Sequence, residues 1–579
     1  MCGICAAISD ENQIANVVSG LKKLEYRGYD SCGIAFLEND KIKSIKCVGE
    51  ISGLIEKTRG IFSSCVIGHT RWATHGVANE INAHPHFSFD KKFAIVHNGI
   101  IENYDEIRKN FLNGIKLETD TDTEIMVNLF ATENGNMIEK IVSGCKKIKG
   151  SYAFALINCG KKKIYLAKRN SPLYVAVKND AAMAGSDISV FAGQFDAFFA
   201  LENDEIAEMS VGRVVFYDKN GKIIKKEKKL LNKYDFLDEN LNEKYFMLKE
   251  IKQQPFCLKK SHSKYFHENI FQFISEIKKY NFFHFIACGT AYHACLMGSL
   301  YLEEIAGKNC ETSIASEFRY SHRRLRKNCL YVFVSQSGET ADTIACAKMV
   351  KAAGCKTLCI TNVEYSTLNR LADFSLPTFA GKEIAVASTK AYTSQIFALL
   401  VLAKKLAGEE FADESKRFVS RFDVDFEKFE NMLDVTRFEK VFFVGRQQDY
   451  VASLEGSLKL KEIAYINCLG LPAGELKHGT LALVDSKTLV IVISTVDSVK
   501  GKIESNIKEI QARNGKIMLV TNLKHNIDVD FTIRLDDFDK CFMPIVSVIP
   551  LQVLAFDTAL RLGHNPDRPR NLAKSVTVE

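Results

Sequence analysis

Val332-Phe333-Val334-Ser335-Gln336-Ser337-Gly338-Glu339-Thr340 is the stretch that decides the fold. A short, β-branched apolar run ends in a glycine-containing turn rich in hydroxyl side chains, and a helical pattern follows. Where a strand turns into a helix, backbone N–H groups, the helix dipole and hydroxyls can surround a phosphate monoester. The turn lacks the Gly-Lys-Ser/Thr ending of a P-loop. It therefore predicts a phosphate-monoester site or, alternatively, an elaborate helix N-cap.

An internal repeat extends this unit over residues 246–579. The matching runs keep nearly constant spacing; they are Phe285–Gly289 with Phe442–Gly445, Val332–Ser335 with Val490–Ile493, and Lys356–Asn362 with Lys516–Asn522. Each copy alternates apolar runs with helical patterns, which is typical of a doubly wound parallel sheet. We therefore expect two such subdomains in tandem. Their turns differ, because the second copy reads Ser494-Thr495-Val496-Asp497 and lacks most of the hydroxyl cluster.

The amino terminus, Met1-Cys2-Gly3-Ile4, carries a second signal. Once the initiator methionine is removed, Cys2 holds a thiol and a free α-amine on one residue. An α-amine titrates near pH ~8, so it can act as general base for its own thiol. Cys2 is therefore a candidate nucleophile that needs no separate histidine. Taken alone, Cys2 is more simply a small residue at a frayed terminus, and the clusters further along the chain favour the nucleophile.

Residues 1–220 alternate short apolar runs with glycine-bearing turns, which predicts a β-rich domain with a few helices. Five polar clusters follow these runs or turns, and so many in one small domain indicate convergence on a pocket. The clusters are Tyr26–Asp30, His69–Gly76, Asn82–His86, His97–Asn103 and Thr119–Glu124.

Composition bounds the class of protein. A chain of 579 residues is too long for one core, and its net charge of +7 does not demand nucleic acid or membrane as a partner. We find no apolar run near the ~18–20 residues that span a bilayer and no secretory signal, so we expect a cytoplasmic protein. Most of the 17 cysteines are then small buried hydrophobes. Cys2 and Cys5 have no second pair at zinc spacing, so neither a metal nor a cofactor is expected.

The first 220 residues resemble the N-terminal-nucleophile glutaminase domain of glutamine amidotransferases. The matching residues are Cys2-Gly3-Ile4, Arg27–Asp30, His69–Gly76, Asn98-Gly99 and Thr121–Glu124. This resemblance implies a four-layered αββα sandwich.

The repeated part resembles the paired sugar-isomerase (SIS) subdomains of the glutamine–fructose-6-phosphate aminotransferases (isomerising), a family with the same domain order. Further matching stretches are Ile314–Tyr320, Glu383–Lys390, Glu455–Glu462, Gly474–Gly479 and Arg570–Glu579. The implied activity transfers the amide nitrogen of L-glutamine to D-fructose 6-phosphate and isomerises the product to D-glucosamine 6-phosphate. This is the first committed step of hexosamine synthesis.

The implied glutamine site suits its ligand. Arg71 would form a bidentate fork with the carboxylate, with Thr74 and His75 close by, and Asp122 would pair with the ammonium. Without the resemblance, the alternative is that Arg71 and Asp122 each form a surface ion pair.

The implied chemistry begins with attack by Cys2 on the amide carbon. The Asn98 side chain and the Gly99 N–H would stabilise the tetrahedral oxyanion, a contribution of roughly 3–4 kcal/mol per donor. Trp72, the only tryptophan, lies beside Arg71 and is expected to gate ammonia between the two sites. The alternative for Trp72 is a static pocket wall.

The resemblance also assigns the sugar site. Lys574 would form a Schiff base with the C2 ketone, and Glu462 would move the proton between C1 and C2. Lys459, three residues from Glu462 on one helix face, would be its electrostatic partner. His478 would open the hexose ring and, in this family, comes from the neighbouring subunit, so a homodimer is expected. The sugar phosphate would be held by Thr290, Ser335, Gln336, Ser337, Thr340, Val386 and Ala573.

The expected boundaries are a glutaminase domain at 1–220, a lysine-rich linker at 221–245, SIS subdomains at 246–425 and 426–564, and a catalytic tail at 565–579. A linker helix is expected at Tyr245–Gln254, interrupted by Pro255. The sequence departs from the family pattern at Ala291, Cys5 and Cys32; Ala291 replaces a serine that often donates to the phosphate.

Two competing interpretations remain. Another glutamine amidotransferase would share residues 1–220 but would need a pyrophosphate or ATP loop, which we do not find. A sugar-phosphate-binding regulator would keep Ser335–Thr340 but would need no Cys2, Glu462 or Lys574. Release of ammonia or glutamate from glutamine, alone and with fructose 6-phosphate, distinguishes these classes.

Overall fold

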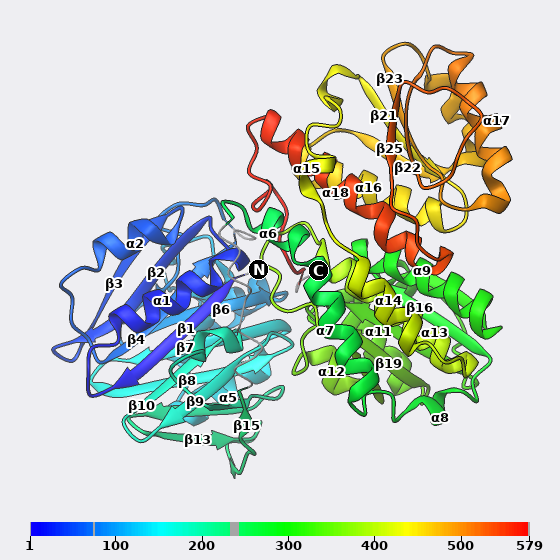
Figure 1. Cartoon of the computed structure of the whole chain (residues 1–579). Coiled ribbons are helices and arrows are strands. Elements are labelled where there is room, and N and C mark those ends of the chain that lie inside the picture. Colours follow the sequence, from blue (N-terminus) through cyan, green and yellow to red (C-terminus); the bar gives the residue numbers. More distant parts are fainter. Residues whose placement is uncertain (1, 73–75, 232–242, 577–579) are drawn as a thin grey trace. The chain divides into compact units, whose positions relative to one another are not determined.

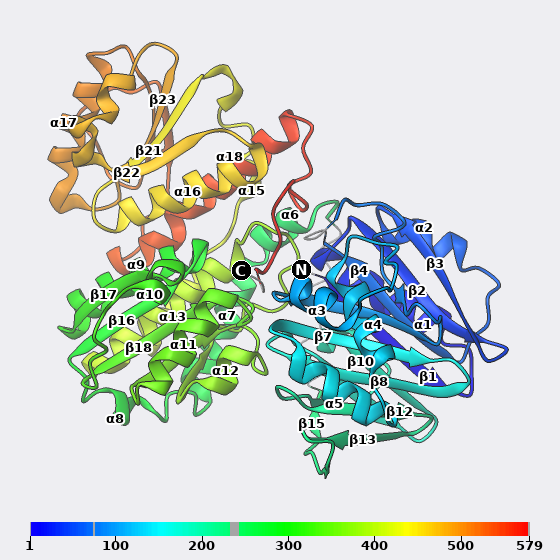
Figure 2. The same ribbon diagram turned by 180° about the vertical axis from the view of Figure 1, so that it is seen from behind.

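The computed structural model describes residues 2–72, 76–231 and 243–576. Contacts divide the chain into two units, residues 1–237 with 573–579 and residues 238–572. Figure 1 labels many of the elements of both units, and Figure 2 shows the same structure from behind. Part of the expected linker forms edge strands, because Ile223–Ile224 pairs with Arg213–Tyr217 and Lys229–Leu230 pairs with Ala197–Ala200. The domain boundaries drawn from the sequence stay a prediction.

Two antiparallel sheets form the first unit. The eight-stranded sheet has the order β15-β11-β9-β10-β1-β4-β2-β3, and the seven-stranded sheet has the order β14-β13-β12-β8-β7-β6-β5. The first sheet contains β1 (Gly3–Ser9), β2 (Ser31–Glu38), β3 (Lys41–Val48), β4 (Cys65–Arg71), β9 (Tyr174–Lys178), β10 (Ala181–Gly185), β11 (Ala197–Ala200) and β15 (Lys229–Leu230). The second contains β5 (His86–Phe87), β6 (Phe93–Ile101), β7 (Gly150–Asn158), β8 (Lys161–Arg169), β12 (Ile206–Ser210), β13 (Arg213–Tyr217) and β14 (Ile223–Ile224).

Helices cover the outer face of each sheet, which gives four layers (Figure 1, Figure 2). They are α1 (Ile14–Leu24) and α2 (Ile51–Lys57) on the first sheet, and α3 (Tyr104–Phe111), α4 (Asp122–Thr132) and α5 (Met137–Lys147) on the second. Strand β1 is buried along its whole length, because apolar side chains fill both of its faces. One core lies between the sheets and another lies between β6–β8 and the helices α4 and α5. The expected αββα sandwich is confirmed.

Two five-stranded parallel sheets form the second unit, with the matching orders β17-β16-β18-β19-β20 and β22-β21-β23-β24-β25. The first copy contains β16 (Phe282–Ala287), β17 (Asn309–Ile314), β18 (Cys329–Ser335), β19 (Lys356–Thr361) and β20 (Phe374–Pro377). The second contains β21 (Lys440–Gly445), β22 (Cys468–Pro472), β23 (Thr488–Ile493), β24 (Lys516–Thr521) and β25 (Phe531–Arg534). The repeat and its doubly wound sheets are therefore confirmed, because apolar runs that match in sequence occupy matching strands.

One continuous apolar core runs through both copies and is built largely on long helices. These helices are α9 (Gly289–Ala306), α13 (Lys390–Ala407), α16 (Gln448–Ala464) and α18 (Met543–Arg561). The opposite faces of the two sheets carry α10 (Ala315–Tyr320) and α11 (Ala341–Ala352) in the first copy and α17 (Lys500–Gln511) in the second. The remaining helices are α6 (Phe246–Lys252), α7 (Gln254–His267), α8 (Ile274–Ile277), α12 (Thr367–Leu371), α14 (Ala412–Arg421) and α15 (Phe426–Phe429).

Two local expectations need correction. Pro255 lies in the first turn of α7, so it starts a second helix directly after α6. A proline is tolerated there because the first N–H groups of a helix have no intrahelical partner. Among the described residues, the segment Lys540–Arg561 is long and apolar enough to cross a membrane by length and composition, although no such run was expected. Its most apolar window is 94% buried inside the protein, as in a core helix.

Candidate active sites

Cys2 lies directly before β1, and its sulfur faces the backbone of Trp72. The Trp72 N–H donates to Cys2 Sγ at 3.3 Å. Burial raises the pKa of the Cys2 thiol, and the Trp72 N–H and the nearby Arg71 cation only partly oppose this rise. Because the thiolate is the nucleophile, a thiol in these surroundings needs a base to remove its proton.

Asn98 and Gly99 lie in β6, beside Cys2. The Asn98 side chain donates from Nδ2 to the backbone oxygen of Cys2 at 3.1 Å. Gly99 has φ +138°, and a Cβ there would lie 2.1 Å from the Ser151 oxygen. Only glycine therefore fits this position. The structure thus brings Cys2 and Asn98 together, as the sequence predicts, and places Gly99 next to them.

Arg71 ends β4, and Asp122 is the first residue of α4. Their side chains act electrostatically on the Cys2 thiol in opposite senses. Arg71 donates to the oxygens of Gly76 and Val77, and Asp122 Oδ2 accepts from the Ile101 N–H at 2.9 Å. Arg71 is 3% exposed and Asp122 is 7% exposed, so the surface ion-pair alternative is wrong for both. Thr74 and His75 lie outside the described residues.

Arg27, from another of the polar clusters, pairs with an acidic side chain of its own domain. Its guanidinium forms a buried ion pair with Asp187 at 2.5 Å and donates to the Ser186 oxygen at 3.2 Å. The Ser186 hydroxyl in turn accepts from the Ile4 N–H at 3.0 Å. Arg27 therefore holds Ser186 in place, and Ser186 in turn binds the start of β1.

The phosphate-type turn follows β18. Ser335 Oγ accepts from the Gly338 N–H at 3.0 Å and lies 3.1 Å from Thr340 Oγ1. Gly338 has φ +65°, and a Cβ there would lie 2.1 Å from Ser366 Oγ, so the turn requires glycine. Thr340 precedes α11 but makes no side-chain capping bond to it among the described residues. The N-cap alternative therefore does not account for the Thr340 hydroxyl. Gln336 and Ser337 lie in the same turn.

A buried network of charges lies at the start of α9 and along α16. Lys459 Nζ lies 2.6 Å from Glu462 and 3.4 Å from Glu455. The Thr290 hydroxyl donates to Glu455 at 3.0 Å and accepts from Lys459 at 3.1 Å. His293 Nδ1 lies 2.7 Å from the other Glu455 oxygen.

The network favours the charged forms of Glu455 and Lys459. Burial opposes ionisation, but Lys459, His293 and Thr290 hold the pKa of Glu455 below its usual value. Glu455 and Glu462 likewise raise the pKa of Lys459 although the lysine is fully buried. The side chain of Glu462 is 21% exposed and lines a cavity of about 300 Å³ with Tyr465 and Arg570. Glu462 can therefore reach a ligand in the cavity, whereas the buried Lys459 contacts the Glu462 carboxylate from the interior.

The second copy fills its equivalent turn with its own carboxylate. Asp449, in the first turn of α16, accepts from the Thr495 N–H at 2.7 Å and from the Thr495 hydroxyl at 2.5 Å. Burial raises the pKa of Asp449 to about 6. An internal anion thus takes the bonds that a phosphate would receive, so the two copies differ in chemistry although they share one topology.

The other predicted sugar-site residues belong to other segments of the chain. The Val386 N–H donates to the Asp567 oxygen at 3.1 Å, and His478 is exposed at the end of a short 3₁₀ helix. Ala573 and Lys574 are grouped with the first unit, whereas the turn and the charge network lie in the second. The roles of these residues stay predictions.

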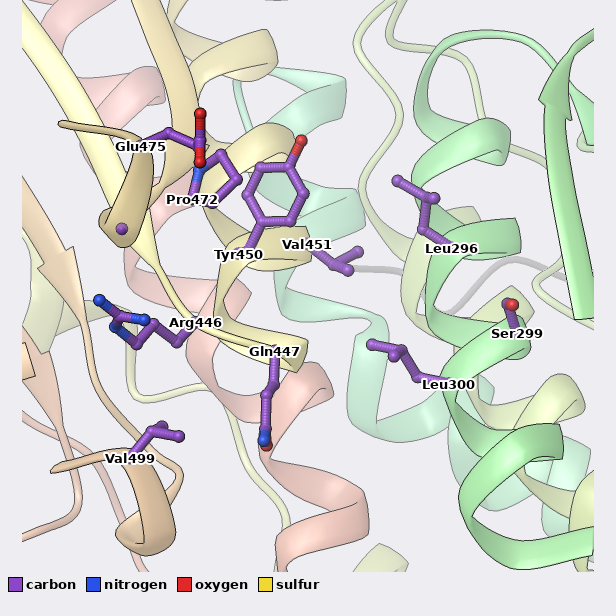
Figure 3. Close-up of a pocket in the computed structure, with 11 residues that line it drawn as sticks. Leu296, Ser299, Leu300, Arg446, Gln447, Tyr450, Val451, Pro472, Glu475 and Val499 are labelled. Atoms are coloured by element: carbon purple, nitrogen blue, oxygen red, sulfur yellow. The ribbon is translucent and has the colours of Figure 1, made fainter. Parts of the chain in front are cut away.

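A larger cavity of about 550 Å³ lies between α9 and the β21–α16 connection, in the second unit (Figure 3). Figure 3 shows Leu296 and Leu300 on one side and Arg446, Tyr450 and Glu475 on the other. None of the sugar-site residues predicted from the sequence lines this cavity. Within the described ranges, no group of three or more His, Cys, Asp or Glu side chains is placed to hold a metal ion.

Family models agree with this arrangement. A glutamine amidotransferase domain model matches residues 69–193, and an SIS domain model matches residues 277–405 and 436–562. The C-terminal domain of the glucosamine-fructose-6-phosphate aminotransferase of Francisella tularensis is 33% identical, with a TM-score of 0.54; the match covers 57% of this chain and all of that one. The tagatose-6-phosphate ketose/aldose isomerase of Escherichia coli has a TM-score of 0.50 at 17% identity, over 58% of this chain and 99% of that one, which shows the fold alone.

The fold and the matching family models define a glutamine amidotransferase domain followed by two SIS domains. Relatives that match over the whole of both chains identify the family within this class. The glutamine–fructose-6-phosphate aminotransferases (isomerising) of Shouchella clausii and Halalkalibacterium halodurans are each 40% identical, over 100% of this chain and 100% of theirs. The chain belongs to the glutamine–fructose-6-phosphate aminotransferase (isomerising) family.

Proposed function

We propose that this chain moves the amide nitrogen of L-glutamine to D-fructose 6-phosphate, releases L-glutamate and isomerises the product to D-glucosamine 6-phosphate. The observation that carries the proposal is the end-to-end match to relatives of that name. The geometry supports it, because one chain holds a Cys2–Asn98 pair for amide cleavage and a Lys459–Glu462 pair for proton transfer. An amidotransferase with another sugar-phosphate acceptor is the second candidate.

At the glutaminase site, Arg71 holds the glutamine carboxylate and Asp122 holds its ammonium. The α-amine of Cys2 takes the thiol proton, and sulfur attacks the amide carbon. Asn98 Nδ2 and the Gly99 N–H stabilise the oxyanion. Collapse of this intermediate breaks the C–N bond, and nitrogen leaves as ammonia with the proton. Water then hydrolyses the thioester to glutamate.

At the sugar site, the turn Ser335–Thr340 holds the phosphate, and the Lys574 amine condenses with the C2 ketone with loss of water. Ammonia displaces Lys574 from C2. Glu462 then moves a proton between C1 and C2, with Lys459 holding the carboxylate in place. His478 of a second copy opens the hexose ring, so the working form is a homodimer. We place the enzyme in the cytoplasm.

The direct test measures glutamate, ammonia and glucosamine 6-phosphate with glutamine alone and with fructose 6-phosphate added. We expect one glucosamine 6-phosphate per glutamate in the complete mixture and none with Cys2→Ser. Glutamate release without an aminated sugar would point to another acceptor. Borohydride should trap fructose 6-phosphate on Lys574, and a label on another lysine would refute that assignment.

Trp72 is proposed as the gate for ammonia. Its backbone N–H donates to Cys2 Sγ at 3.3 Å, and its ring packs edge-to-face against the ring of Tyr29 with centroids 5.6 Å apart. A residue tied to the nucleophile can respond to its acylation. Trp72→Ala should keep glutamine hydrolysis but yield less glucosamine 6-phosphate per glutamate. An unchanged ratio would mean that Trp72 is a static wall.

A further inference from the structure

Four buried histidines form a cluster that reaches Asn98, the hydrogen-bond partner of Cys2, and the proposed mechanism uses none of them. His69, on β4, stacks on His84 with ring centroids 4.0 Å apart, and His84 packs edge-on against His86 at 4.6 Å. His97 is the fourth member, because its backbone N–H donates to His84 Nδ1 at 3.2 Å. All four are at most 5% exposed.

His69 makes the contact that matters for chemistry. Its Nε2 lies 2.9 Å from the His97 backbone oxygen and 3.0 Å from Asn98 Oδ1. A backbone oxygen can only accept, so His69 Nε2 must carry a hydrogen. The other ring nitrogen, Nδ1, is buried and has no hydrogen-bond partner in the part of the chain that the structure describes. The ring is therefore a neutral tautomer that donates from Nε2.

The surroundings keep this tautomer over the working pH range. Burial lowers the pKa of His69 to about 3, and the nearby His97 and Arg71 also disfavour a second proton. Hydrogen bonds to the His97 oxygen and to Asn98 oppose this only in part. His69 is thus a fixed hydrogen-bond donor and not a proton shuttle.

A fixed donor at Nε2 determines how the Asn98 amide is turned. With Oδ1 accepting from His69, the opposite Nδ2 donates to the Cys2 oxygen at 3.1 Å. If the amide flipped, Oδ1 would face the Cys2 oxygen and Nδ2 would face the His69 N–H. Two acceptors and two donors would then oppose each other, and both bonds would be lost. The only orientation in which both bonds form points the amide N–H₂ towards Cys2.

We propose that His69 is a positioning residue for glutamine hydrolysis, because its Nε2–H bond holds the Asn98 amide with Nδ2 facing the nucleophile. The inference rests on the proposed role of Asn98 as an oxyanion donor. It adds a residue from the other sheet, since His69 lies in β4 and Asn98 in β6. The oxyanion site is thus assembled across the interface between the two sheets.

The test compares His69→Phe with His86→Phe. Phenylalanine keeps a ring of similar size but removes the donor, and His86 belongs to the same stack while facing Thr121. Loss of one oxyanion donor lowers kcat by roughly 10²–10³-fold in comparable sites, so a misoriented donor should cost about 10–100-fold. We expect this loss for His69→Phe, with KM for glutamine within about twofold, and near-normal activity for His86→Phe. Equal losses in both variants would overturn the proposal.

Three further measurements separate positioning from general damage. Alkylation of Cys2 by iodoacetamide forms no oxyanion and should proceed at the wild-type rate in His69→Phe. Inhibition by glutamate γ-semialdehyde, which forms a tetrahedral adduct with the thiol, should weaken by the same factor as kcat. His69→Gln, which retains an N–H donor, should recover part of the activity; a slowed alkylation, or a lack of recovery, would contradict the proposal.

A double-mutant cycle distinguishes failure of this inference from failure of the proposed function. In an Asn98→Ala background, His69→Phe should cause no further loss, because the group that it positions is absent. If Asn98→Ala alone hydrolyses glutamine normally, the proposed oxyanion role of Asn98 is wrong. If Asn98→Ala is impaired but the two losses multiply, that role stands and His69 does not act through Asn98.

Discussion

Replacing Thr290 by valine tests whether this residue binds the sugar phosphate or supports the charge network. The two side chains have similar volume, so the main change is loss of the hydroxyl. That hydroxyl donates to Glu455 at 3.0 Å and accepts from Lys459 at 3.1 Å. Its single hydrogen is thus used inside the protein, and only its backbone N–H, in the first turn of α9, is left to face a phosphate.

The magnitude follows from the burial of both partners. Glu455 and Lys459 have fully buried side chains, and a hydrogen bond to a charged group contributes about 1.5–3 kcal/mol. In the variant, Glu455 still contacts His293 and Lys459 still contacts Glu462. We therefore take the lower value of this range for each of the two lost hydrogen bonds, which gives about 3 kcal/mol in all. If half of this is lost in the transition state, kcat for glucosamine 6-phosphate falls about tenfold.

Steady-state kinetics with fructose 6-phosphate decide between the two roles. Thr290→Val should lower kcat with KM within about threefold, whereas Ser337→Ala, in the phosphate turn, should mainly raise KM. Glutaminase activity without the sugar should be unchanged, because Cys2 lies in the other unit. A raised KM with normal kcat in Thr290→Val would refute the network role and restore direct phosphate binding.

Three other changes test the sites independently. Asp449→Asn should flatten the pH dependence of thermal unfolding. The pKa of Asp449 is about 6 in the folded protein, against an ordinary value of 3.8, so between these pH values the folded state binds more protons than the unfolded state. The wild-type protein should therefore lose about 3 kcal/mol of stability as pH rises from about 4 to 6, and the variant should not. Melting midpoints that follow the same pH slope in both proteins would contradict this. Gly99→Ala should abolish glutamate release because its Cβ would lie 2.1 Å from the Ser151 oxygen, while fructose 6-phosphate still binds; normal glutamate release would show that the strand tolerates a side chain. Blocking removal of Met1, verified by mass spectrometry, should abolish glutamine hydrolysis because the α-amine of Cys2 is then part of a peptide bond; full activity would exclude that amine as the base.

Local patterns in the sequence are enough to predict much of the architecture. Apolar runs separated by helical stretches predict the strands of both copies, because burial on both faces of a parallel sheet requires such runs. The spacing of Lys459 and Glu462 likewise predicts their pairing, since residues three apart share one helix face. The position of Cys2 beside Met1 marks the candidate nucleophile without reference to any tertiary contact. These inferences depend only on neighbours along the chain.

Contacts between distant segments are visible only in the tertiary structure. Glu455 meets Thr290 from another helix, His69 meets Asn98 from another sheet, and Asp449 fills the turn at Thr495. Nothing in the spacing of these residues indicates the pairing, because packing of the elements determines which side chains meet. Burial then decides their charge state, since removing water raises the pKa of Asp449 and lowers that of His69. Local sequence therefore specifies the elements and the nucleophile, whereas the packed fold decides which groups orient them.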